Sequence, residues 1–179
     1  MRIVNAKDRN MEKIFKSLDA LRVKKGPRYA IENIYYDSKR KNLVATNGKV
    51  MISYKVDDPE TLEALGDEIG YFQLQGKILM EIEKPAAMFP EYWRIIPDFT
   101  KMKSAALSEY SIGGISAKAK PHQVMNALSL ITGKIFSMEQ APFLAGLDLD
   151  TCYHAPDKKL SAVAVVGGNI VVMIQPFYK

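Results

Sequence analysis

The stretch LVATNGKVM, residues 43–51, decides the fold class of this chain. Its centre, Asn47-Gly48, joins two apolar runs at 43–46 and 50–56. Asparagine and glycine tolerate positive φ better than other residues, so this pair between two apolar runs favours a tight β-hairpin turn. We therefore predict two adjacent antiparallel strands joined by a two-residue turn.

Upstream of the hairpin, residues 8–21 have the periodicity of an amphipathic helix. The apolar residues recur at spacings of three and four and form one stripe, which comprises Met11, Ile14, Phe15, Leu18 and Leu21. Gly26-Pro27 is a stop signal for the helix. A short strand at 2–6 precedes the helix, and another strand is expected at 29–36, before the polar turn 37–42. The pattern of the N-terminal half therefore predicts a strand, a helix and three strands, in that order.

Downstream, a less regular region extends to about residue 105. Residues 57–67 have the apolar spacing of a short helix, 71–74 predict a strand, and 78–82 suit a strand or a helix. Three prolines then fall between residues 84 and 103 among aromatic side chains, which excludes a continuous helix and disfavours a central strand. We interpret the region around 57–105 as an insertion rich in proline and aromatic residues.

The order of elements then recurs in the second half. A strand is predicted at 110–116, and a helix opens at Pro121 and ends at Thr132-Gly133. Three further strands are predicted at 143–152, 160–166 and 170–175. The halves share architecture without obvious sequence identity, and each pairs a helix with strands. We therefore predict a single α+β domain over 1–179, made of two βαβββ half-repeats with two adjacent helices backed by antiparallel sheets.

The composition is that of an ordinary globular protein, with 47% apolar and 25% charged residues. No stretch suits a signal peptide or a membrane span, so we expect a cytoplasmic protein. Cys152 is the single cysteine and cannot form an internal disulfide. With His154 it could form a nucleophile pair, but a half-buried strand residue beside a turn histidine is the favoured interpretation. The other histidine, His122, lies far away in sequence, which disfavours a zinc site.

Positive charge is concentrated toward the N-terminal end. Residues 1–55 contain 14 Lys+Arg and 5 Asp+Glu, whereas residues 56–179 contain 11 and 15. A basic patch raises the local concentration of polyanions, of which nucleic acid is the commonest. On charge alone, a solvated basic surface without a partner remains an equal alternative.

Three segments are distinctive together: residues 27–51, FPEYWRIIP at 89–97, and IVVMIQP at 170–176. They resemble, in order, the "RY…N" strand with its "ATDGHRL" hairpin, the "FPDYRRVLP" segment and the closing "YVVMPMRL" strand of the bacterial sliding clamp, the β subunit of DNA polymerase III. This chain departs from the family by carrying Lys49-Val50 in place of the histidine-arginine pair of the hairpin. It also has the length of one domain plus an insertion, where the family chain has three domains.

The resemblance implies a non-enzymatic processivity factor that binds duplex DNA without reading its sequence. Sliding requires cations on helix faces that contact phosphates and leave base edges alone. The implied DNA-binding residues are Arg9, Lys13 and Lys16 on the polar face of the first helix, with Arg22, Lys24 and Lys25 at its exit. A solvated helix face is the alternative, and the second helix carries no firm charge on its polar face.

The resemblance also implies a hydrophobic cleft that accepts short peptide motifs from DNA polymerases and the clamp loader. Its walls would comprise Thr46, Gly48, Val50, Met51, Pro90, Ile95, Val171 and Met173. Methionine is flexible and polarizable, which suits a site that accepts several peptides. The alternative is that the apolar members are plain core residues.

Catalysis has little support in this sequence. It contains no GxSxG, no HExxH, no Walker loop and no dinucleotide fingerprint, so we expect no enzyme, cofactor or metal. Asp148 and Asp150 share one strand face, but two carboxylates are weak evidence for a cation. Three hypotheses follow: a homo-oligomeric sliding clamp, from a phage or mobile element; a clamp-fold protein that binds peptides without forming a ring; and an unrelated α+β enzyme.

Overall fold

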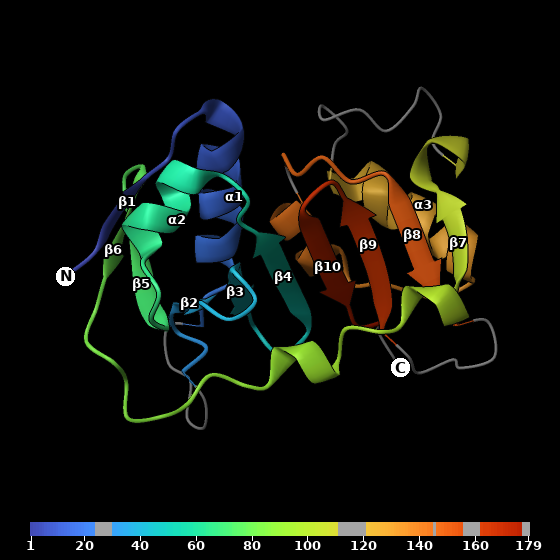
Figure 1. The fold of residues 1–179 in the computed structure, drawn as a ribbon. Coiled ribbons are helices and arrows are strands. Elements are labelled where there is room, and N and C mark those ends of the chain that lie inside the picture. Colours follow the sequence, from blue (N-terminus) through green and yellow to red (C-terminus); the bar gives the residue numbers. More distant parts are fainter. Residues whose placement is uncertain (24–29, 111–120, 145, 156–161, 177–179) are drawn as a thin grey trace. The chain divides into compact units, whose positions relative to one another are not determined.

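The computed structural model describes residues 1–23, 30–110, 121–144, 146–155 and 162–176. The chain forms two compact units, Met1–Tyr92 and Trp93–Lys179. Each unit contains an antiparallel sheet and one long helix (Figure 1). The mixed helix and sheet composition confirms the predicted α+β class.

The first unit is built on a six-stranded sheet in the order β1-β6-β5-β2-β3-β4. Its strands are β1 (Ile3–Asn5), β2 (Ile34–Asp37), β3 (Asn42–Thr46), β4 (Val50–Lys55), β5 (Gly70–Gln75) and β6 (Ile78–Glu81), and its helices are α1 (Arg9–Ala20) and α2 (Pro59–Leu65). Every neighbouring pair of strands within this sheet is antiparallel. The hairpin β5–β6 lies between β1 and β2, so the sheet takes in part of the region that follows residue 57.

Helix α1 confirms the predicted amphipathic helix. Asp8 caps it, because its carboxylate accepts a 2.7 Å hydrogen bond from the backbone N–H of Met11. The apolar stripe is buried, and Phe15 and Leu18 are fully inaccessible to solvent. Burying side chains of this size stabilises a fold by roughly 1.5–3 kcal/mol each. The helix packs on β3, β4 and β5 (Figure 1). Its polar residues Arg9, Asn10 and Lys16 are exposed.

The hairpin at residues 43–51 is confirmed as β3–β4, but its turn is longer than predicted. Thr46 pairs with Met51, so four residues, 47–50, lie between the two members of this last pair. Asn47 does not adopt positive φ; its side-chain oxygen accepts hydrogen bonds from the N–H groups of Lys49 (2.9 Å) and Val50 (2.8 Å). Gly48 alone takes positive φ, at 84°. Asparagine therefore acts here through side-chain hydrogen bonds.

The second unit has a four-stranded sheet in the order β10-β9-β8-β7, with every neighbouring pair antiparallel. Its strands are β7 (Lys103–Ala106), β8 (Thr151–His154), β9 (Val163–Gly167) and β10 (Ile170–Ile174), and its long helix is α3 (Pro121–Thr132). Short 3-10 helices occur at η1 (Tyr92–Arg94), η2 (Phe99–Lys101), η3 (Leu107–Tyr110) and η4 (Met138–Leu144). The order strand, helix and three strands matches the β1-α1-β2-β3-β4 part of the first unit.

Three strand predictions need correction. The strand expected at 143–152 is wrong over most of its length, because Met138–Leu144 is a 3-10 helix containing Pro142 and β8 begins only at Thr151. The strand expected at 29–36 begins only at Ile34, since residues 31–33 form a turn. Of the strand expected at 110–116, Tyr110 ends η3 and the other residues lie outside the described ranges. Residues 103–106 occupy the position of that strand.

Candidate nucleic-acid interface

Five cationic side chains surround a shallow depression of about 580 Å³ at the N-terminal end of α1. It is lined by Ala6, Lys7, Asp8, Arg9, Glu12, Lys13, Lys16 and Lys77. The segment Lys7–Lys16 runs from the end of β1 into the helix, whereas Lys77 comes from the turn between β5 and β6. The turn is held there by a 3.3 Å hydrogen bond from the N–H of Ala6 to the carbonyl of Lys77. We call this surface the basic depression.

Glu12 organises two of these cations. Its carboxylate accepts 2.6 Å and 2.9 Å hydrogen bonds from the ammonium groups of Lys16 and Lys77. Lys16, and then Lys77, lower the pKa of Glu12 to about 2. Glu12 therefore remains ionised at neutral pH and holds the two lysines in place.

Lys7 is also paired, since its ammonium group lies 2.8 Å from a carboxylate oxygen of Asp58. That hydrogen bond raises the pKa of Lys7 and, with Thr61, lowers the pKa of Asp58 to about 2. Arg9 and Lys13 form no ion pair with a described residue. These two side chains are therefore the cations of the basic depression best able to bind an external anion.

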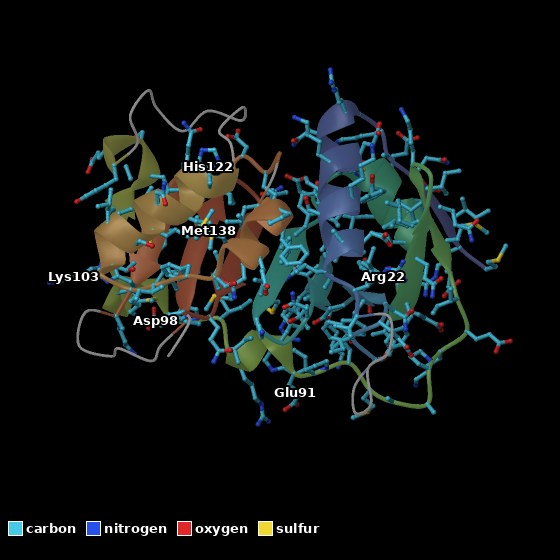
Figure 2. All side chains as sticks on the ribbon, turned by 180° about the vertical axis from the view of Figure 1, so that it is seen from behind. Arg22, Glu91, Asp98, Lys103, His122 and Met138 are labelled. Carbon is cyan, nitrogen blue, oxygen red and sulfur yellow. The ribbon has the colours of Figure 1, made fainter. Side chains whose placement is uncertain are left out.

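The predicted DNA-binding residues do not all lie together. Arg9, Lys13 and Lys16 share the basic depression. Arg22 follows the opposite end of α1 (Figure 2), where its guanidinium donates to Asp19 (2.6 Å) and to the carbonyl of Glu32 (3.1 Å). Lys24 and Lys25 lie outside the described residues.

Sequence reasoning missed Lys7 and Lys77 as members of this surface. Lys7 lies one residue before the helix cap, which is a local signal that could have placed it near Arg9. Lys77 is 61 positions from Lys16, and only the pairing of β6 with β1 brings its turn to the helix. No local pattern could have shown that neighbourhood.

The hairpin contributes four of the predicted cleft residues to the first unit. The Thr46 hydroxyl donates to the carbonyl of Val50 (2.8 Å) and accepts from the N–H of Gly48 (3.0 Å). Gly48 is exposed, whereas Val50 and Met51 are only 1% and 2% exposed. The two apolar hairpin residues therefore contribute to the core of the unit.

Pro90 is held in the first unit by its aromatic neighbours. The ring of Phe89 stacks on the ring of Tyr35 with centroids 4.8 Å apart. The backbone N–H of Phe89 donates a 3.4 Å hydrogen bond to the hydroxyl of Tyr71. Tyr92 is buried beside the β2–β3 turn. These contacts of Phe89 and Tyr92 anchor the proline-rich segment to the first unit at residues 89–92.

The remaining cleft residues belong to the second unit. Ile95 is 58% exposed, Val171 is partly buried in β10, and Met173 on the same strand is 5% exposed. Val171 and Met173 alternate with Val172, so they share one face of the sheet.

Metal binding and the reactivity of Cys152 can be judged from the described residues. They include no group of three or more His, Cys, Asp or Glu side chains placed to hold a metal ion. Cys152 is fully buried, and burial raises the pKa of its thiol to about 12, which disfavours the reactive thiolate. Among the same residues, no helix has the length and apolar character needed to cross a bilayer.

Comparisons with known proteins identify the fold. No protein-family model matches the chain, and no curated protein matches it. Solved structures of bacterial DNA polymerase III β chains are similar over 99% of this chain. The Streptococcus pneumoniae TIGR4 chain has a TM-score of 0.55 and 13% identity, and 64% of its length is covered. The Thermotoga maritima chain has a TM-score of 0.58 and 10% identity, and 65% of its length is covered. The Helicobacter pylori clamp, solved with a DNA ligase peptide, has a TM-score of 0.51 and 12% identity, and 66% of its length is covered.

The chain thus spans less than two thirds of the length of these clamp chains. Sequence identities of 10–13% support a statement about the fold and leave activity and partners to be proposed. The repeated order of strand, helix and three strands in the two units agrees with that likeness. The chain therefore has the fold of the bacterial DNA sliding clamp.

Proposed function

We propose that the protein is a sliding-clamp-like DNA polymerase processivity factor that acts without catalysis in the cytoplasm. It binds duplex DNA non-specifically through the basic depression of α1, and it binds polymerase or clamp-loader peptides through a hydrophobic cleft. The observation that carries this proposal is the basic depression on the outward face of α1, in a chain with the sliding-clamp fold.

The chemistry of this face suits phosphate contacts without base recognition. Lysine and arginine side chains contact phosphate oxygens through charge, and such contacts carry no sequence information. The five cations of the basic depression are opposed by two carboxylates of its lining, Asp8 and Glu12. A net positive surface on a rigid helix therefore attracts DNA while allowing it to move.

The two units, on this proposal, together form one clamp-like domain. Six such chains would supply a six-domain ring, and three would suffice if each unit acts as a domain. A closed homo-oligomer gives a single defined mass in light scattering, whereas an open assembly grows with concentration.

The peptide cleft, on this proposal, comprises the eight residues predicted for it from the sequence. Support comes from the Helicobacter pylori clamp of the same fold, which was solved with a DNA ligase peptide. Val50 and Met51 are core residues in the free protein, so peptide contact would fall on Thr46, Gly48 and the exposed Ile95. Ile95→Asp is expected to abolish binding of a polymerase-derived peptide and leave duplex binding intact.

A salt titration tests the DNA part of the proposal. Arg9→Glu with Lys13→Glu reverses the two cations that form no ion pair with a described residue. The matched control is Lys39→Glu with Lys84→Glu, exposed lysines elsewhere in the unit. Each lost phosphate contact lowers the slope of log affinity against log salt by about 0.9, so the double variant loses roughly two. Equal slopes for test and control variants would exclude the basic depression as the DNA site.

A second candidate function is a peptide-binding protein of clamp fold that forms no ring. The observation in its favour is the Glu12 carboxylate, which neutralises part of the basic depression. A monomer in light scattering, with peptide binding but no salt-dependent binding to duplex DNA, would establish this function.

A further inference from the structure

Two lysines of the basic depression share one carboxylate in the free protein. The Lys16 ammonium donates a 2.6 Å hydrogen bond to one oxygen of Glu12, and the Lys77 ammonium lies 2.9 Å from the other oxygen. One lysine comes from α1 and the other from the turn between β5 and β6. The carboxylate therefore lies between two cations that come from distant segments. We call Lys16 and Lys77 the lysine pair.

The lysine pair is open to solvent, although its partner is not. The side chains of Lys16 and Lys77 are 58% and 72% exposed, whereas that of Glu12 is 18% exposed. An ammonium group has three N–H donors. Each lysine directs its ammonium to a single oxygen of Glu12 and forms no other ion pair with a described residue. The lysine pair therefore keeps donors available for an external anion.

The backbone places both lysines without help from Glu12. Lys77 follows Gly76 in the two-residue turn between β5 and β6, and Gly76 takes the positive φ, 65°, that such a turn requires. The N–H of Ala6 ties this turn to the end of β1 through a 3.3 Å hydrogen bond to the carbonyl of Lys77. Lys16 lies within α1, one helical turn after Glu12. Glu12 therefore attracts two ammonium groups whose backbones are already in position.

The Glu12 carboxylate differs from the other carboxylate that pairs with a lysine of the basic depression. Asp58 binds Lys7, and it also caps α2 by accepting a 2.9 Å hydrogen bond from the N–H of Thr61. Among the described residues, the Glu12 carboxylate contacts the lysine pair and caps no helix. Exposed ion pairs of this kind are weak and are screened by salt. An incoming anion can therefore replace the carboxylate at little cost to the fold.

We propose that the lysine pair is a phosphate subsite of the DNA interface and that Glu12 occupies this subsite in the free protein as a competing anion. When duplex DNA binds, a backbone phosphate replaces the carboxylate between the two ammonium groups. This inference rests on the proposed function, and it assigns a DNA contact to Lys77 on the β5–β6 turn. Arg9 and Lys13 form no ion pair with a described residue, so they bind phosphates without an exchange. Competition by Glu12 limits the affinity, which favours a duplex that can move.

The sign of one substitution separates competition from positioning. If Glu12 competes, Glu12→Gln frees both lysines and the affinity for duplex DNA rises. If Glu12 instead positions the lysines for DNA, the same change lowers the affinity. We expect a rise of roughly two- to tenfold at low salt, as for the loss of two exposed ion pairs. The slope of log affinity against log salt should steepen by roughly one to two, since each phosphate contact contributes about 0.9.

Fluorescence anisotropy of a labelled blunt duplex measures both quantities on the full chain. The matched control is Glu63→Gln, which removes the same charge from an exposed position on α2. Thermal unfolding establishes that both variants are folded. An affinity of Glu12→Gln that equals or falls below that of the control would overturn the proposal.

A double-mutant cycle tests the role of Lys77 in the subsite. Lys77→Met should lower duplex affinity more in the Glu12→Gln protein than in the unchanged protein, because only there is the ammonium free of its competitor. Lys39→Met changes an exposed lysine between β2 and β3 and should have the same effect in both backgrounds. Additive effects of Lys77→Met and Glu12→Gln would exclude Lys77 from the subsite and contradict the proposal.

A second probe separates this inference from the proposed function. Isothermal titration calorimetry with sodium tripolyphosphate, which carries phosphates but no bases, reports on the subsite without DNA. If Glu12→Gln binds tripolyphosphate more tightly than Glu63→Gln does and no variant binds duplex, the phosphate subsite is supported and its assignment to DNA is overturned. If duplex binding depends on Arg9 and Lys13 while Glu12→Gln matches the control with both probes, the DNA function stands and the competition is wrong. Absence of binding to either probe in every variant would overturn both.

Discussion

The hydroxyl of Tyr92 donates a 3.0 Å hydrogen bond to a carboxylate oxygen of Asp37 in the interior of the first unit. The same oxygen accepts a 3.1 Å hydrogen bond from the guanidinium of Arg40, and Asn42 donates to the Tyr92 hydroxyl at 3.3 Å. Asp37 and Tyr92 are 3% and 2% exposed. This network ties the end of the proline-rich segment to the β2–β3 turn, 55 positions away.

Tyr92→Phe is expected to destabilise the protein by about 1–3 kcal/mol, because the buried Asp37 carboxylate loses a hydrogen-bond donor. The free energy of unfolding in urea measures this loss. Tyr110→Phe is the matched control, since Tyr110 is 42% exposed. Equal stability of the two variants would show that the hydroxyl of Tyr92 contributes nothing.

Alkaline pH is expected to unfold the protein partly through Tyr92. Burial, and then the Asp37 carboxylate, raise the pKa of the phenol above its ordinary value of 10.0. The folded state therefore retains a proton that the unfolded state releases, so this stabilisation is present below pH 10 and declines as pH rises above it. Thermal unfolding between pH 9 and 11 should show a smaller decline for Tyr92→Phe than for the unchanged protein. Parallel curves would contradict the prediction.

Acid is expected to remove the stabilisation that ionised Glu12 contributes to the fold through its ion pairs with Lys16 and Lys77. Its folded pKa of about 2 lies below the ordinary value of 4.5, so its contribution is present above pH 4.5 and is lost as pH falls toward 2. Glu12→Gln should reduce the slope of stability against pH in this interval. Glu63→Gln on α2, an exposed carboxyl, serves as the control. The contribution should also shrink in high salt, because these pairs are at the surface.

Gly167→Ala is expected to disrupt the second unit. A Cβ atom at Gly167 would overlap the carbonyl oxygen of Asp148 and lie 2.7 Å from Cα of Leu149, so the backbone must move. Overpacking of this kind costs about 1–3 kcal/mol or more. Gly168→Ala is the informative comparison, because its Cβ meets nothing within 4 Å and only its φ of 50° opposes alanine, at about 1–2 kcal/mol. Urea unfolding should rank Gly167→Ala as the more damaging change.

Several elements were predictable because their signals are local. The spacing of Met11 to Leu21 defines the buried stripe of α1. The β3–β4 hairpin was predictable from the two apolar runs that flank Asn47-Gly48. The sequence could not distinguish the predicted two-residue turn from the observed turn, in which four residues lie between paired Thr46 and Met51 and the Asn47 side chain accepts hydrogen bonds. At 143–152, apolar residues alone misled the assignment, because an apolar run suits a 3-10 helix or loop as well as a strand.

The sequence by itself determined the α+β class, the amphipathic α1 with its basic outer face, and the resemblance to the sliding clamp. Only the tertiary structure decided which distant residues meet. It placed β5–β6 between β1 and β2, brought Lys77 to Lys16, and set Lys103 opposite His154. The physical reason is that helix and turn preferences depend on residues a few positions apart. The register of paired strands depends on the burial and hydrogen bonding of the whole sheet.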